Sequence, residues 1–212
     1  MSCLRVRKRL VKNNWLRAKP ALGEFFMNLV LAVTGATGVY AAELLIDKSP
    51  WPVTLVASEW GREVCCREGT PLEKLEARAD RVCRDDDLSS VISSGSVPTA
   101  GMVILPCTTN MLAKVSAGIC DTLIARAAHC HLKEQRKLVL CVRETPWSAI
   151  DFGNAERLSQ AGGTVMPLSP PFYMAADRSP DEITMRELMS LFVDRVLQIL
   201  GAPAENNWET LS

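Results

Sequence analysis

Glycine and hydroxyl residues follow three apolar runs of this chain, at the points where predicted strands end. The first run enters the sequence GATG at residues 35–38, the second ends at Ser58, and Thr108 and Thr109 follow the third. Because parallel strands present their carboxyl ends at one edge of a sheet, we expect these groups to share the rim where open α/β sheets bind ligands. Glycines, hydroxyls and helix-start amides favour a phosphate or a polar ring edge there. Each residue taken singly has the alternative of an ordinary turn or helix cap.

Four basic side chains and a tyrosine form a second candidate site for an anion. Arg126 and Lys133 are seven residues apart in one predicted helix, which places them on nearly the same face. Arg143 follows a predicted strand, and Arg195 lies in the last predicted helix. Together with Tyr173 in the sequence PPFYM, these residues can hold a phosphate group. Lys133 by itself has the alternative of a solvated helix end.

Two charged residues at the end of an apolar run are a third signal. Residues 138–142, LVLCV, predict a strand buried on both faces, and Arg143 and Glu144 follow it directly. Taking either charge out of water without a partner is costly. The strand therefore either reaches the surface here or delivers both charges into a cleft at its carboxyl end.

The elements that must position these residues alternate between apolar runs and helical patterns, which predicts βαβ units and a parallel sheet. The predicted strands are Leu29–Thr34, Val53–Ser58, Met102–Pro106, Leu138–Val142 and Thr164–Pro167, and the predicted helices between them are 39–48, 59–67, 109–118, 121–134 and 150–161. A last helix is predicted at 181–200, with Ser179 as its N-cap and its end at Gly201. The polar segment 84–100 is predicted to be a long surface connection.

Composition predicts one soluble globular domain. The chain has 212 residues, 48% of them hydrophobic, and no apolar run approaches the roughly 18 residues of a membrane span. The formal charge is zero, but residues 1–27 are strongly basic, which leaves the rest of the chain with an excess of acids. That excess argues against a nucleic-acid-binding surface.

The basic segment 1–27 has three interpretations: a transit peptide, a disordered appendage, or upstream sequence translated ahead of Met27. We expect it to lie outside the fold, with a single domain at 28–201 and a tail at 202–212. The expected location is cytoplasmic, or mitochondrial if residues 1–27 are a transit peptide.

Eight cysteines raise the question of a disulfide framework or a metal site. Cys107 and Cys141 lie in or beside apolar strands, no C-x-x-C pair occurs, and the sequence His-Cys-His at 129–131 has no second ligand cluster to join it. We therefore expect reduced core thiols of a cytosolic protein and no bound metal.

Six sequence stretches resemble the flavin prenyltransferases of the UbiX family. In chain order they are GATG, ISSGS, GMVILPC, RAA, LKEQRKLVLCVRETP and MPLSPPFY, and the similarity runs from about residue 28 to about residue 200. The most specific part is LVLCVRETP followed by MPLSPPFY. The resemblance implies an α/β fold, a three-layer sandwich with a doubly wound parallel sheet of the flavodoxin-like or Rossmann-like kind. It also implies assembly into a dodecamer.

The activity that the resemblance implies is transfer of a dimethylallyl group from dimethylallyl monophosphate to N5 and C6 of reduced FMN, without a metal. The product, prenylated FMN, would serve UbiD-type decarboxylases, including those of ubiquinone synthesis. The implied FMN contacts are Gly35, Ala36, Thr37, Ser58, Thr108, Thr109, Asn110, Met111 and Arg126. The implied contacts of the prenyl phosphate are Lys133, Arg143, Tyr173 and Arg195. The implied catalytic residues near the reacting centre are Glu144, Glu68 and Thr37.

Several positions depart from the family pattern. Thr37 stands where serine is usual, Met111 replaces a threonine, and His129 replaces an aspartate. Asn110 resembles the residue found in the related peptidyl-cysteine decarboxylases that use FMN. Such a decarboxylase is the main rival function, although it has no need of a second phosphate pocket. A non-enzymatic flavin-binding regulatory subunit is the other rival.

Overall fold

The computed structural model describes residues 27–170, 172–175 and 178–203. These residues form a six-stranded parallel sheet in the order β3-β2-β1-β4-β5-β6. The strands are β1 (Asn28–Val33), β2 (Val53–Ala57), β3 (Arg81–Arg84), β4 (Thr99–Cys107), β5 (Leu138–Val142) and β6 (Thr164–Pro167). Because β4 pairs with β1 and not with β3, the winding reverses between β1 and β4, which makes this pair the topological switch point of the sheet.

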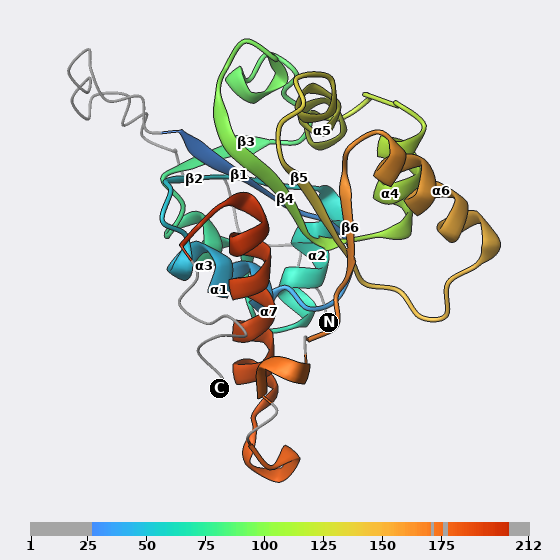
Figure 1. The fold of residues 1–212 in the computed structure, drawn as a ribbon. Helices are drawn as coiled ribbons and strands as arrows, with labels where there is room; N and C mark the ends of the chain where they lie inside the picture. Colours follow the sequence, from blue (N-terminus) through green and yellow to red (C-terminus); the bar gives the residue numbers. More distant parts are fainter. Residues whose placement is uncertain (1–26, 171, 176–177, 204–212) are drawn as a thin grey trace, which may run out of the picture.

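Helices cover both faces of the sheet (Figure 1). One face carries α1 (Tyr40–Lys48), α2 (Glu59–Arg67), α3 (Leu72–Glu76) and α7 (Met185–Leu200), and the other carries α4 (Thr109–Ser116), α5 (Leu123–Lys133) and α6 (Ala149–Gln160). This arrangement confirms the predicted three-layer α/β sandwich with a doubly wound parallel sheet. The predicted segments 1–27 and 202–212 lie almost entirely outside the described residues.

The central strands are apolar on both faces because each face packs against helices. Leu29, Leu31 and Val33 of β1 contribute to the core beneath α1 and α7, whereas Val30 and Ala32 contribute to the core beneath α4 and α5. All five side chains are fully buried. The unbroken apolar runs that predicted the strands therefore follow from the three-layer architecture.

Two short elements escaped prediction from the sequence. The edge strand β3 has the sequence RVCR, in which three of the four residues are exposed, so no apolar run marks it. It is held instead by parallel pairing with β2. The helix α3 has only five residues. The predicted surface connection at 84–100 contains a 3-10 turn, η1 (Val91–Ser93), and its two ends belong to β3 and β4.

The last helix starts later than predicted. Ser179 caps a 3-10 turn, η3 (Pro180–Glu182), and α7 begins only after Thr184. The Thr184 hydroxyl accepts a hydrogen bond from the Glu187 amide at 3.2 Å, and the Glu187 carboxylate accepts one from the Thr184 amide at 2.8 Å. This reciprocal capping box sets the start of the helix. The predicted end is confirmed, since Gly201 follows α7 with a left-handed φ of 101°.

Candidate functional site

The residues that follow β1, β2, β4 and β5 form one rim at the carboxyl edge of the sheet (Figure 1). Backbone hydrogen bonds join them across the strands. The Ser58 amide donates to the Val33 carbonyl at 3.0 Å, and the Arg143 amide donates to the Cys107 carbonyl at 3.0 Å. The structure thus places the GATG loop, Ser58, Thr108 and Arg143 on the same edge, with the switch point between β1 and β4 at its centre.

The glycine loop at 35–38 leads into α1, and its anion-binding amides already hold an anion. Both carboxylate oxygens of Glu68 accept from the Gly38 amide, at 2.9 and 3.0 Å, and one of them also accepts from the Val39 amide at 2.8 Å. Gly38 adopts a left-handed φ of 99°, which turns the chain into the helix. The sequence predicted a ligand anion at this helix start, but in the structure a carboxylate of the protein occupies it.

Two further helices begin at the rim, and a hydroxyl residue caps each of them. The Ser58 hydroxyl accepts from the Gly61 amide at 3.0 Å at the start of α2, and the Thr108 hydroxyl accepts from the Met111 amide at 3.1 Å at the start of α4. A helix leaves its first amides without partners inside the helix, and a cap satisfies only one of them. Both helix starts therefore still favour an anion at this rim.

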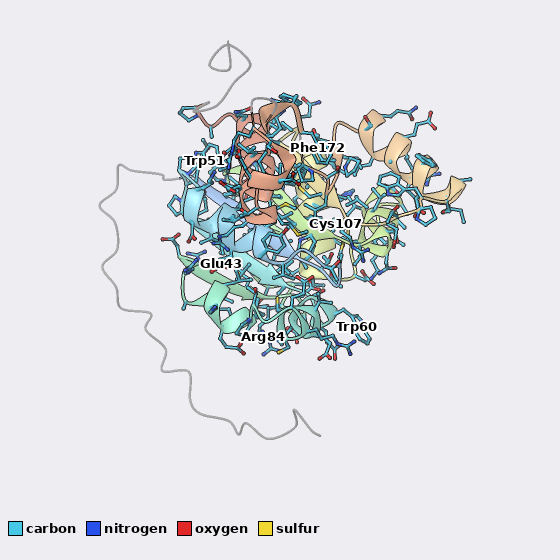
Figure 2. All side chains as sticks on the ribbon, turned by 90° about the horizontal axis from the view of Figure 1, so that it is seen from below. Glu43, Trp51, Trp60, Arg84, Cys107 and Phe172 are labelled. Atoms are coloured by element: carbon cyan, nitrogen blue, oxygen red, sulfur yellow. The ribbon has the colours of Figure 1, made fainter. Side chains whose placement is uncertain are left out.

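An exposed tryptophan that the sequence reasoning missed lies against the glycine loop. A Cβ atom on Gly35 would lie 2.6 Å from the Cβ of Trp60, so glycine is needed here for close packing against α2. The Trp60 side chain is 70% exposed, and in Figure 2 it lies at the edge of the molecule, whereas Cys107 lies nearer the middle. It offers a flat apolar surface beside the rim. The signal in the sequence was an aromatic residue two positions after the cap Ser58.

Arg143 is half-buried at the rim, and its guanidinium has an unused donor. The Nε atom is buried and finds no hydrogen-bond partner among the residues that the structure describes. A buried donor without an acceptor is destabilising unless a ligand supplies the acceptor. The neighbouring Glu144 is exposed, and its carboxylate accepts from the Thr145 amide at 3.1 Å. Within the described ranges no ion pair joins Arg143 to Glu144.

Arg126 lies in the first turn of α5, half-buried and directed towards η1. Its Nε donates to the Ser93 carbonyl at 3.1 Å, and the same carbonyl accepts from the Cys130 thiol at 3.2 Å. The side chain is thus held in place on the face of the sheet that carries α4 and α5. The remaining guanidinium nitrogens provide further donors for an anion.

Two of the predicted contacts of the prenyl phosphate, Lys133 and Arg195, do not lie beside Arg143 within one chain. Lys133 ends α5 at the amino edge of the sheet, where its Nζ lies 3.4 Å from the Glu134 carboxylate. Arg195 lies near the same edge on the opposite face, in the half of α7 that approaches the start of β4, and it donates to Gln198 at 3.3 Å. Tyr173 is 46% exposed in η2 (Phe172–Ala175), outside the sheet layers. Arg143 lies at the rim, on the opposite edge of the sheet from Lys133 and Arg195.

Thiols near the rim are held neutral by burial. Burial raises the pKa of both Cys107 and Cys141, and the proximity of Cys141 adds to the effect on Cys107. Burial likewise raises the pKa of Cys65 to about 11. Among the described residues all seven cysteines are free. Cys65, Cys107 and Cys141 therefore act as core residues and not as thiolate nucleophiles.

A cavity of about 490 Å³ opens at the outer part of the same edge, beside β3. Its lining includes Leu55, Leu72, Val82, Arg62, Asp85 and Asp121. Asp85 belongs to the fold there, because its carboxylate accepts from the Ile124 amide at 2.9 Å at the start of α5. The cavity is separate from the switch point, and its acidic lining disfavours a phosphate.

The described part of the chain contains no cluster of three or more His, Cys, Asp or Glu side chains suited to a metal ion. None of the helices described there is both long and apolar enough to span a membrane.

Sheet order and site together define a class of protein. A doubly wound sheet with glycine, hydroxyl and basic groups at its switch point is typical of α/β proteins that bind nucleotides. The sequence pattern of the Flavoprotein family matches residues 25–197 of this chain. The chain is thus a flavoprotein by class. Curated relatives show to which family of flavoproteins it belongs.

Two of these relatives are named flavin prenyltransferase UbiX. The protein from Thermoplasma acidophilum is 38% identical over 177 residues, covering 82% of this chain and 95% of the relative. The protein from Deinococcus radiodurans is 41% identical over 186 residues, covering 85% of this chain and 92% of the relative. The chain belongs to the UbiX family of flavin prenyltransferases.

Solved structures show the same fold over most of the chain. The crystal structure of AnUbiX (PadA1) in complex with FMN and dimethylallyl pyrophosphate superposes with a TM-score of 0.78 at 32% identity, covering 86% of this chain and 98% of that one. A dodecameric FMN-dependent UbiX-like decarboxylase from Escherichia coli O157:H7 superposes with a TM-score of 0.76 at 35% identity, covering 86% and 99%.

Proposed function

We propose that this chain transfers a dimethylallyl group from dimethylallyl monophosphate to N5 and C6 of reduced FMN. The names of the curated relatives and the two ligands bound by AnUbiX support this reaction. The observation in this chain that carries the proposal is the buried Nε of Arg143, which lacks an acceptor among the described residues and lies on the rim next to β4. A phosphate at the rim would supply that acceptor.

The residues at the rim fit a flavin mononucleotide. The helix starts at Ser58 and Thr108 suit its phosphate, with Thr109, Asn110 and Met111 in the first turn of α4 and Arg126 as a further contact. Gly35 and Ala36 are proposed as backbone contacts of the flavin, and Trp60, which packs against Gly35, offers the ring an apolar surface. Reduced flavin, when bound, supplies the nucleophilic nitrogen and carbon atoms. The protein's part is to orient it and to exclude water.

The leaving phosphate needs its charge neutralised, and Arg143 is placed to do this. As the allylic C–O bond breaks, phosphate departs with the bonding electron pair, and the guanidinium donates to the oxygen that gains charge. A hydrogen bond to a charged group is worth about 1.5–3 kcal/mol. Since each 1.4 kcal/mol realised in the transition state is about tenfold in rate, this contact alone is worth about one to two orders of magnitude.

The other three phosphate contacts are proposed to come from neighbouring copies. Lys133 and Arg195 lie towards the amino edge of the sheet in this chain, away from Arg143. Assembly into a dodecamer, as described for the Escherichia coli relative, would bring such residues to the rim of another subunit. Exposed apolar side chains on η2 and α6, Phe172 and Phe152, at 67% and 62% exposed, are suited to burial in this assembly.

Carboxylates and a hydroxyl complete the proposed centre. Glu144 follows Arg143 directly and is exposed at the rim, so it can stabilise the allylic cation and remove the proton that is lost when the new ring closes. Glu68, through the Gly38 and Val39 amides, holds the loop that carries the Thr37 hydroxyl. We propose a UbiD-type decarboxylase as the recipient of the prenylated FMN.

A mass spectrum tests the proposal against its rivals. The full chain is incubated anaerobically with reduced FMN and dimethylallyl monophosphate, the flavin is extracted, and its molecular mass is measured. A flavin heavier by one dimethylallyl group is expected, with none when the prenyl phosphate is omitted. Decarboxylation of a peptide with a C-terminal cysteine, or flavin binding without any product, would support one of the rivals instead. A Glu144→Gln protein that prenylates at the normal rate would refute the role of Glu144.

A further inference from the structure

Thr34 is a buried polar residue at the rim that none of the candidate contacts includes. It follows β1 directly and is 1% exposed. Its hydroxyl donates to the Pro106 carbonyl at 2.9 Å and accepts from the Thr108 amide at 2.9 Å. Its own amide donates to the same Pro106 carbonyl at 3.2 Å. One side chain thus joins the end of β1 to the end of β4 across the switch point.

The Thr34 hydroxyl supplies hydrogen bonds between β1 and β4 at the point where the regular backbone pairing of these strands stops. The β1–β4 register ends with Ala32 opposite Ile104, and the β4–β5 register shifts between Ile104 and Cys107. Pro106 has no amide hydrogen, so it cannot donate in either ladder. The last residues of β4 are therefore positioned against β1 by the side chain of Thr34 and not by strand pairing alone.

Both flanks of the switch point depend on this residue. On one side the Thr34 carbonyl accepts from the Ala36 amide at 2.8 Å, which shapes the GATG loop. On the other side the Thr108 amide, bound to the Thr34 hydroxyl, fixes the residue that caps α4 through Met111. We propose that Thr34 is a positioning residue for the flavin, because it sets the distance between the glycine loop and the start of α4. The inference rests on the proposed function, in that the ligand is FMN.

The chain offers a matched control. Thr54 in β2 is also 1% exposed, and its hydroxyl accepts from the side-chain amide of Asn28 at 3.3 Å. It lies near the amino edge of the sheet, where it pairs with Val30. A Thr→Val change there removes a buried hydroxyl from a strand without touching the rim.

The experiment compares Thr34→Val, Thr34→Ser and Thr54→Val in the full chain. FMN dissociation constants are measured by flavin fluorescence, together with melting temperatures and with kcat and KM for FMN. Thr34→Val is expected to raise the FMN dissociation constant about tenfold, because the Thr108 amide loses its acceptor and the Pro106 carbonyl keeps only the Thr34 amide. Thr34→Ser, which keeps the hydroxyl, is expected to stay within about twofold of the unchanged protein. Thr54→Val is expected to lower the melting temperature and leave FMN affinity unchanged.

The outcomes separate the inference from the proposed function. Equal FMN affinity in Thr34→Val and the unchanged chain, or an equal loss in Thr54→Val, would overturn the positioning role. An unchanged chain that binds no FMN would overturn the proposed function and this inference with it. If Thr34→Val does not fold, Thr34→Cys provides the same comparison, because sulfur keeps the volume and hydrogen-bonds weakly.

Discussion

Each end of β4 is held by one buried polar side chain. The two ends differ in whether the neighbouring buried donors and acceptors all find partners within the protein. At the carboxyl end Thr34 joins β4 to β1 beside the rim. At the amino end His131 of α5 is 2% exposed, donates from Nδ1 to the Ala127 carbonyl at 2.7 Å, and accepts at Nε2 from the Thr99 hydroxyl at 2.8 Å. Both residues satisfy backbone or side-chain groups that would otherwise be buried unpaired.

At the amino end of β4 the protein supplies hydrogen-bond partners for the buried polar side chain, whereas near the carboxyl end one buried donor has no acceptor among the described residues. Both His131 nitrogens have partners, and burial lowers its pKa, so the neutral ring is a fixed part of the core. Near Thr34, by contrast, the Nε of Arg143 has no acceptor in the described part of the chain. The comparison teaches that the buried histidine at the amino edge serves the fold, whereas the open donor at the carboxyl edge fits the ligand site that we propose there.

The largest effect is expected from Arg143→Ala. Loss of the guanidinium should lower the rate of prenyl transfer about 10–100-fold, because a charged hydrogen bond to the leaving phosphate is lost. The free energy of unfolding measured in urea without ligand should not fall, since the Nε atom that is removed has no acceptor within the described residues. Arg157→Ala, at an exposed position on α6, is the matched control. Equal rates for the two variants would contradict the assignment.

The opposite result is expected from His131→Gln at the other end of β4. The free energy of unfolding should fall by about 1–3 kcal/mol, since the Thr99 hydroxyl and the Ala127 carbonyl lose well-placed partners. FMN affinity should not change. Urea denaturation and flavin titration measure the two quantities, and His129→Gln on the same helix is the control. A variant that loses FMN binding while keeping its stability would remove the distinction between the two ends.

The pH dependence of stability should also identify the amino end. Burial holds the pKa of His131 below its ordinary value of 6.5, so the unfolded chain takes up a proton before the folded chain does. The contribution of His131 is therefore complete above about pH 6.5 and declines as the pH falls below it. Glu187, whose pKa is lowered from 4.5 to about 2 by hydrogen bonds from Thr184, stabilises the fold at neutral pH and loses this contribution only below about pH 4.5. Urea midpoints between about pH 5 and 7.5 should fall with acidity, and the slope should shrink in His131→Gln.

The smallest effect is expected from Lys48→Ala. Lys48 ends α1 and lies 2.6 Å from Asp194 of α7, with the two side chains 33% and 17% exposed. Partly exposed pairs of this kind contribute about 0–1 kcal/mol. The melting temperature should fall by less than in His131→Gln, with FMN affinity unaffected. A loss larger than that of His131→Gln would show that surface pairing, and not the buried histidine, stabilises this edge.

Part of the site followed from the sequence because it depends on local patterns. Hydroxyl residues after apolar runs predicted Ser58 and Thr108 at one rim, since parallel strands align their carboxyl ends. The role of Glu68 could not be predicted in this way, because its carboxylate reaches amides 30 residues earlier in the chain. Trp60 and Thr34 were missed for the same reason: each acts through residues that only the folded chain brings close.

The sequence by itself determined the alternation of buried strands and amphipathic helices, and hence the layers and the carboxyl edge at which we propose that FMN binds. These features depend on hydrophobic periodicity and chain order, which are local properties. Only the tertiary structure decided that the exposed segment Arg81–Arg84 joins the sheet, that Lys133 and Arg195 lie away from Arg143, and that one threonine joins β1 to β4. Such contacts depend on strand register and on long-range hydrogen bonds, which carry no periodic signal in the sequence.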